Sequence, residues 1–298
     1  MEWTLTAPII SHEKNYRFQP LTNKHHEIII KYCTGKDNPG LVMFMQDLLG
    51  ELCLDKTINF SDLPAIDQLF LMIRIRSICI GTALEVVVDE KIDGENVPVT
   101  HKVSLIDFQK SINRHYVQPI VVTSDNGDIK TTIHYPKTWD TPQDYHYLKK
   151  ICVDDKELNL EKLSESEITE LISNMYRTYQ LDIAKAIEKV KNSINKMVFV
   201  RIPGETPGVD DPDITIHPDQ FSHIIRVVYS DTLSNFAELM YVFVKVMNFT
   251  LSDAMKLTPA DTQLYYQMFV KEMNEKEKAA RSAQQAQNSR SSRQVPSR

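Results

Sequence analysis

The stretch LPAIDQLFLMIRIRSICIGTALEV, residues 63–86, is the most informative part of this 298-residue chain. Its spacing predicts a helix that begins near Pro64 and ends before Gly81, because glycine favours a helix C-terminus. Apolar residues occur on almost every side of this helix, so it must be buried on most sides. A buried helix rarely carries unpaired charges, yet this one contains Asp67, Arg74 and Arg76.

These three charged residues allow different interpretations. Asp67 lies in the first turn, where the unpaired amides and the helix dipole stabilise a carboxylate. Arg74 follows on nearly the same face, and Arg76 projects about 160° away from it. Each arginine could reach the surface or pair with a nearby carboxylate, or an arginine face could contact another subunit. We expect Arg74 to be a buried structural partner and Arg76 to lie at an interface.

Two shorter helices are expected before this one, in a module of residues 1–83 that begins with an extended arm. Thr22 can cap the first helix, which stops near Gly35. Asn38 followed by Pro39 is typical of a cap and a first helical residue, and predicts the start of the second helix.

The pattern becomes β-type after residue 83. LEVVVDE and VPVTHKVSL flank a polar DGEN turn, while HYVQPIVVT and IKTTIHY flank SDNGD, a hairpin signal with Asn126 and Gly127 at its tip. Residues 84–152 are therefore expected to form a β-rich module. We expect a helical stretch to begin near PQDYHYLKK, residues 142–150.

The remaining chain is expected to be helical with one interruption. Residues 153–202 form a helical module in which Ser164 and Glu167 make a capping box. Residues 203–219 form a proline-rich loop, residues 220–284 a C-terminal helical module, and residues 285–298 a disordered tail. The predicted fold class is α+β, mainly helical with a small central antiparallel sheet.

The amino-acid composition argues against several classes of function. A formal net charge of −6 argues against wholesale nucleic-acid binding, which needs a clustered basic surface. The four cysteines form no CxxC pair, which favours reduced, buried thiols in a cytosolic protein. No signal peptide and no membrane span are expected.

Evidence for catalytic or metal chemistry is weak. The loop at residues 210–219 gathers acidic residues and His217 but lacks the EF-hand pattern, so we expect neither a metal nor another cofactor. Two alternatives to a binding function stay open. One is a hydrolase that uses this acidic loop, although a proline-rich loop supports paired carboxylates poorly. The other is a nucleic-acid-binding regulator that uses the basic C-terminal tail.

The segments RFQPLTNKHHEIII and LPAIDQLFLMIRIRSICIG resemble the baseplate hub assembly proteins of T4-like contractile-tailed phages. The resemblance includes an arm that leads into the first helix, with Arg17, Phe18, Pro20 and Leu21. It also includes a helix that carries Asp67, Leu69, Phe70, Arg74, Ser77 and Gly81. Residues 231–278 follow the order of the family's C-terminal helices, and the middle of the chain is similar only in layout.

The resemblance implies an assembly factor or minor hub component that binds other baseplate hub or tail proteins and is not an enzyme. With this resemblance, the alternative enzyme would be a hub-associated hydrolase that uses residues 210–219. From the composition and the lack of catalytic motifs, we expect no small-molecule substrate, nucleic acid or membrane as partner. The expected location is the host cytoplasm during assembly, or the tail baseplate of the virion. The β-rich part lacks the cysteine pairs of many relatives, so a structural metal is not expected. Asp67, Arg74 and Arg76 are expected to serve the fold or an interface.

Overall fold

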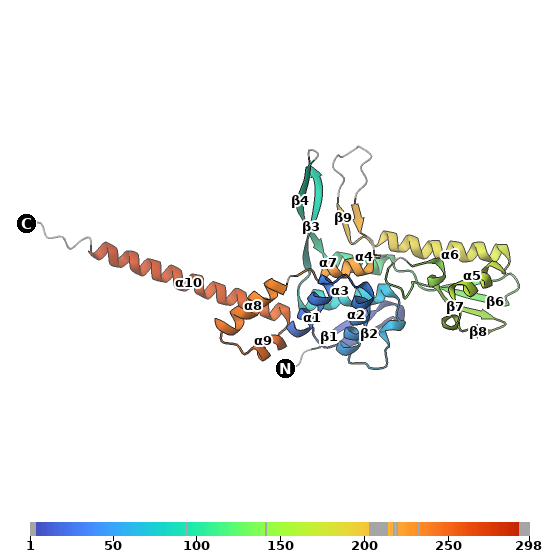
Figure 1. Cartoon of the computed structure of the whole chain (residues 1–298), viewed down its shortest axis with the longest axis horizontal. Coiled ribbons are helices and arrows are strands. Elements are labelled where there is room, and N and C mark those ends of the chain that lie inside the picture. The colour runs from blue at the N-terminus through green and yellow to red at the C-terminus, as the bar shows by residue number, and fades with distance from the viewer. Residues whose placement is uncertain are drawn as a thin grey trace, which may run out of the picture.

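The computed structural model describes residues 4–92, 95–140, 142–202, 214–216, 218, 220–231 and 233–291. Helix α3 (Ala65–Cys79) lies in the middle of the body and contacts α2, α4, α7 and β1 (Figure 1). Thirteen of its 15 residues are buried, as its continuous apolar sequence requires. The helix ends where Gly81 adopts a φ of +156°, in the range that favours glycine.

The N-terminal part surrounds α3. Strands β1 (Leu5–Ile9) and β2 (Lys14–Phe18) form an antiparallel hairpin, joined by a 3-10 turn, η1 (Ile10–His12). Two helices follow, α1 (Asn23–Thr34) and α2 (Asn38–Leu52), and a second 3-10 turn, η2 (Phe60–Asp62), leads into α3. The extended arm expected at the start of the chain is thus one strand of a hairpin.

The middle of the chain forms a side module beside this body (Figure 1). Its four-stranded antiparallel sheet has the order β5-β6-β7-β8, and α6 covers β5 and β6. A separate long hairpin, β3–β4, projects from the body. The elements are β3 (Ala83–Ile92), β4 (Glu95–Ser104), α4 (Leu105–His115), β5 (Ile120–Thr123), β6 (Ile129–Ile133), η3 (Asp144–Tyr147), β7 (Leu148–Val153), β8 (Lys156–Leu158), η4 (Leu160–Lys162), α5 (Glu165–Ser173), α6 (Arg177–Lys196), β9 (Val200–Ile202) and β10 (Ile214–Ile216).

The C-terminal part leaves the body as an arm. Helix α7 (Phe221–Val228) still packs on α3, whereas α8 (Leu233–Lys245) and α9 (Leu251–Lys256) pack on α1. A small second core joins them, made of Ile30, Phe236, Met240, Phe243 and Ala254. Helix α10 (Pro259–Ser291) then extends away from the rest of the molecule (Figure 1).

The predicted fold class is confirmed: the protein is mainly helical with small antiparallel sheets. The β-structure is divided among separate small sheets, however, and is not one central sheet. The capping box of Ser164 and Glu167 forms, and Gly127 adopts a positive φ at the β5–β6 turn. Thr22 caps α1 as expected, but Asp37 caps α2, because its side chain accepts a hydrogen bond from the Gly40 amide.

Three local predictions differ from the structure. The helix expected near residues 142–150 is wrong, since buried Leu148 and Ile151 lie on strand β7 after a 3-10 turn. Helix α4 lies unexpectedly inside the β-rich segment. The tail expected to be disordered from residue 285 is helical through Ser291, and residues 292–298 lie outside the described part. The module boundaries themselves stay a prediction.

Candidate functional site

The C-terminal end of α3 is held by Arg76. Its side chain is buried, and Nε donates to the Val228 carbonyl at 2.5 Å while Nη1 donates to the Gly81 carbonyl at 2.6 Å. Burial lowers the pKa of this guanidinium from its ordinary value. Arg76 therefore joins the end of α3 to α7 through hydrogen bonds to backbone carbonyls.

Ser77 and Tyr229 support the same end of the helix. The Ser77 hydroxyl donates to the Ile73 carbonyl at 2.7 Å and accepts from Gln109 Nε2 of α4 at 2.8 Å. The Tyr229 hydroxyl donates to the Met72 carbonyl at 3.0 Å. These buried polar groups satisfy one another, as a packed interior requires.

The two arginines have the reverse of their expected environments. Arg76, expected at an interface, is a buried structural residue. Arg74, expected to be buried, is partly exposed and makes no hydrogen bond or ion pair with any described residue. Leu69 and Phe70 lie in the main core. The residues of α3 that carry the family resemblance thus lie at both ends of the helix and within the core. They do not form one site.

Asp67 is the unusual group at the other end of α3. Its carboxylate is buried, and within the described part of the chain neither oxygen makes a hydrogen bond. The Ser11 hydroxyl and the amides of Ile10 and Ser11 approach it without reaching hydrogen-bonding geometry. Burial raises the pKa of Asp67 to about 6, and these donors offset only part of the effect. Asp67 therefore faces η1, and we find no capping bond from it to the start of α3.

Two tyrosines lie beside this carboxylate, and the ring of His134 contacts both of them. Tyr116 Oη and His134 Nε2 are 3.1 Å apart, and Tyr135 Oη accepts from the Val117 amide at 2.9 Å. Burial, with the nearby Asp67 charge, raises the pKa of both phenols. Burial also lowers the pKa of His134 to about 4, and the charge of Lys149 contributes.

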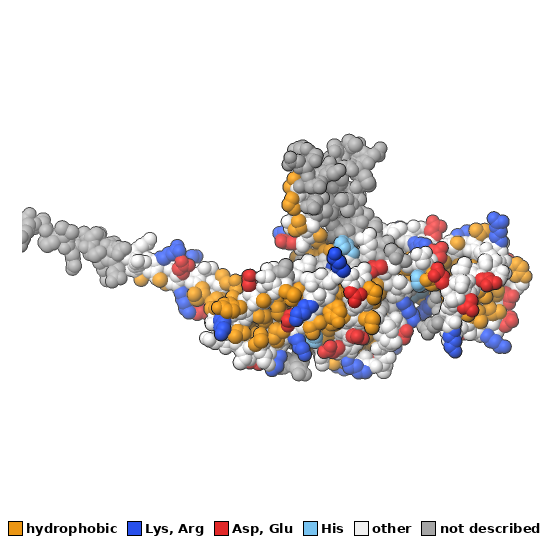
Figure 2. Space-filling model, in the orientation of Figure 1, with side chains coloured by type: hydrophobic (Ala, Val, Ile, Leu, Met, Phe, Trp, Pro, Cys, Tyr) orange, Lys and Arg blue, Asp and Glu red, His pale blue; other side chains and the backbone are white. Residues whose placement is uncertain are grey.

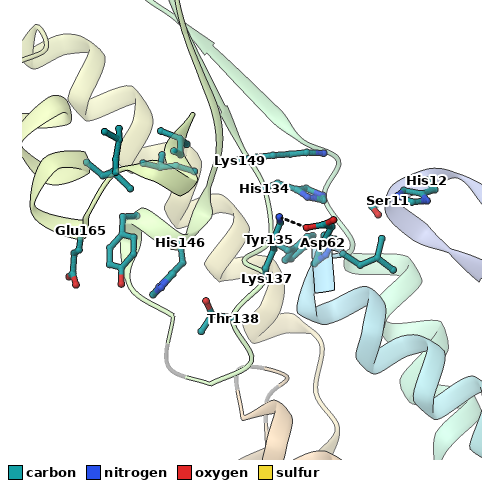
Figure 3. Close-up of a pocket in the computed structure, with 17 residues that line it drawn as sticks. Ser11, His12, Asp62, His134, Tyr135, Lys137, Thr138, His146, Lys149 and Glu165 are labelled. Carbon is teal, nitrogen blue, oxygen red and sulfur yellow. Dashed lines mark hydrogen bonds and ion pairs between the residues drawn. The ribbon is translucent and has the colours of Figure 1, made fainter. Parts of the chain in front are cut away.

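A pocket of about 410 Å³ opens next to this buried cluster, where the body meets the side module (Figure 3). We call it the junction pocket. Its lining comes from η1 and η2 on one side, and on the other from η3, β7, η4, α5 and the segment 134–138 that follows β6. Polar residues include Ser11, His12, Asp62, His134, Lys137, His146, Lys149 and Glu165. Lys137 Nζ and Asp62 Oδ1 form an ion pair across the pocket at 3.1 Å.

None of the residues that line the pocket was a candidate from the sequence; Asp67, which was, lies behind the lining. The polar lining residues are single residues scattered along the chain from Ser11 to Glu165, and no local motif links them. Only the packing of the side module against the η1 and η2 turns brings them together. A local sequence pattern carries no signal for such a site.

The structure also bears on metal binding and on membrane insertion. Across the described ranges, no group of three or more His, Cys, Asp and Glu side chains is placed to hold a metal ion. Much of the acidic loop at residues 210–219, including His217, lies outside the described residues. No helix in the described part is both long and apolar enough to cross a membrane.

The molecule is a mainly helical α+β protein whose clearest features are a pocket between modules and an extended C-terminal arm. The family model of the T4 bacteriophage base plate protein matches residues 2–203, which is more than half of the chain. The chain therefore belongs to the T4 bacteriophage base plate protein family. No curated protein and no solved structure matches it.

The residues matched by the family model differ from those in which the resemblance was expected. The match covers the β-rich middle, for which only a similar layout was expected, and it ends before residues 231–278. The junction pocket, α3 and Asp67 all lie within the matched residues, whereas α8, α9 and α10 lie beyond them.

Proposed function

We propose that this baseplate protein is an assembly factor or minor component of the baseplate hub. It acts by binding other hub or tail proteins and catalyses no reaction. It works in the host cytoplasm during assembly and can stay in the tail baseplate of the virion. Family membership supports the baseplate role, and the resemblance of the N-terminal segments to hub assembly proteins supports the proposed hub role.

One structural observation carries the binding role: an apolar groove on the C-terminal arm. It lies between the end of α8 and helix α10, with Val246, Met247, Tyr265, Met268 and Phe269 in its lining. Met268 is 59% exposed and Val246 48% exposed. Figure 2 shows hydrophobic side chains gathered over this arm. An exposed apolar patch of this kind is typical of a protein-binding surface.

Charged side chains border the groove. Lys271, Glu272 and Glu275 lie along its edge, so an apolar centre is accompanied by a polar rim. This arrangement is the common anatomy of a protein interface. The partner that we assign to it is a hub or tail subunit of the baseplate.

Affinity purification of the tagged full chain from infected cells tests this function. We expect hub or tail subunits to co-purify, and to be lost when Met268→Lys places a charge in the groove. Gln267→Lys is the matched control, since Gln267 is exposed and lines the opposite side of α10. Equal capture by both variants would exclude the groove, and capture of nucleic acid or cell-wall material alone would exclude the proposed function.

A further inference from the structure

Strand β7 carries an irregularity at the junction pocket. Thr132 of β6 pairs with Lys150, whereas the next residue, Ile133, pairs with Leu148, so Lys149 has no partner in the ladder. A β-bulge of this kind changes the direction of a side chain and often occurs next to a binding site. Here the bulged residue lines the pocket.

Lys149 makes no direct ion pair and no hydrogen bond with any described residue, although its charge also acts on the buried Asp67 carboxylate. The neighbouring Lys150, in contrast, pairs with Glu157 at 2.5 Å. The charge of Lys149 acts on the pocket, because it contributes to lowering the pKa of both His12 and His134. Figure 3 shows the three side chains at the same end of the pocket.

The acidic groups of the pocket do not neutralise this end. Asp62 is paired with Lys137, and Glu165 lies on the opposite side, near Tyr145 and His146 (Figure 3). Asp67 feels the charge of Lys149, but it is buried behind the pocket lining and burial raises its pKa to about 6, so it presents no carboxylate to the pocket itself. An anion that entered here would therefore meet an unpaired ammonium group and two imidazoles.

Apolar side chains complete the lining: Leu63, Leu148, Leu160, Leu163 and Ile168. A ligand that fits must combine a negative charge with an apolar body. A volume of about 410 Å³ is within the range of specific ligand pockets. Free phosphate matches this lining poorly, since the pocket contains no arginine and the N-terminus of α5 is already capped by Ser164 and Glu167.

We propose that the junction pocket binds an acidic side chain, flanked by apolar residues, from a peptide segment of a partner protein. Lys149 binds the carboxylate, and the leucine-rich side receives the flanking apolar residues. The inference rests on the proposed function, because a binding protein of the baseplate meets its ligands as protein segments. It assigns a second binding surface, separate from the groove on the C-terminal arm.

A peptide titration of the full chain tests this site. The probes are a pool of capped tripeptides with aspartate between two apolar residues and a matched pool with asparagine at the centre. Histidine ring signals in NMR spectra report binding at His12 and His134. We expect the aspartate pool alone to shift both signals, and Lys149→Ala to weaken this binding about tenfold. Lys150→Ala is the control and should bind as the unmodified chain does.

Several results would overturn the inference. These are equal shifts with the asparagine pool, equal shifts with inorganic phosphate, no shift with either pool, or unchanged binding by Lys149→Ala. A thermal melt of each variant separates lost binding from lost folding. The outcome is independent of the affinity purification. If subunits co-purify but neither peptide pool shifts the histidine signals, the proposed function is retained and this site alone is rejected.

Discussion

Helices α3 and α10 share one secondary structure and have opposite surroundings. In α3, thirteen of 15 residues are buried, including two that carry charge, Asp67 and Arg76. Along the described side chains of α10, residues 259–285, Thr262 alone is buried. The first helix lies inside the body, and the second extends away from it (Figure 1).

The comparison shows that different forces hold the two helices. Packing stabilises α3, so each polar group in it needs a partner or has an altered pKa. Beyond its first turns, α10 depends on helix propensity and on exposed pairs such as Glu272–Lys276 at 2.7 Å. Substitutions in α3 should therefore change folding, whereas substitutions in α10 should change what the protein binds.

A matched pair of leucines gives the largest expected contrast. Leu69 of α3 is fully buried, and Leu264 of α10 is 54% exposed. We expect Leu69→Ala to lower the free energy of unfolding by about 2–5 kcal/mol, because it leaves a cavity in the core. Leu264→Ala should cost less than about 1 kcal/mol. Urea unfolding of both variants measures the difference, and similar losses would show that α10 is packed in solution.

The two arginines of α3 test the comparison within one helix. Arg76→Ala leaves two backbone carbonyls without their donor, and we expect a loss of about 2–4 kcal/mol. Arg74 is partly exposed and has no polar partner among the described residues, so Arg74→Ala should cost less than about 1 kcal/mol. Urea unfolding ranks the two, and a larger loss for Arg74 would restore the roles expected from the sequence.

Asp67 extends the comparison to pH. Its folded pKa of about 6 lies above its ordinary value of 3.8, so the folded state holds a proton more tightly than the unfolded state. The resulting stabilisation is complete below about pH 3.8 and is lost as the pH rises through about 6. The difference in pKa corresponds to a change of about 3 kcal/mol.

Asp67→Asn should remove this dependence. We expect the free energy of unfolding of the variant, relative to the unmodified chain, to rise by up to about 3 kcal/mol between pH 4 and pH 7. Denaturant unfolding at several pH values measures it. Parallel pH profiles for the two proteins would show that Asp67 titrates normally and has a partner in solution.

The bounds of α3 could be predicted because its signals are local: a proline start, a continuous apolar pattern and a terminal glycine. The signals of α4 were also present, since Leu105, Phe108 and Ile112 have helical spacing after Ser104, which caps the helix. They were missed because the segments on either side of α4 have β-type sequences, which favoured a continuous β-rich module. Local patterns therefore suffice for an element whose neighbours do not compete with it.

The environments of side chains depend on tertiary packing, which local patterns do not encode. Arg74 and Arg76 differ by two positions, and only the contact of α3 with α7 decides which one is buried. The junction pocket depends on a register shift between β6 and β7 that places Lys149 outside the ladder. A periodicity argument assigns each residue to a face of its own element, but does not identify what that face meets.

The smallest expected effect concerns the end of α10. Residues 271–285 are all exposed, so the last turns have little to pack against. We expect deletion of residues 285–298 to change the midpoint of thermal unfolding by less than about 1 °C and to remove only some helical circular dichroism signal. Thr262→Val is the contrasting variant on the same helix, because the Thr262 hydroxyl accepts from Asn23 Nδ2 at 2.6 Å and donates to the Thr258 carbonyl. Loss of these buried bonds should cost about 1–3 kcal/mol. A drop of several degrees on truncation would mean that the end of α10 folds back on the body, and the contrast with α3 would then be limited to isolated side chains.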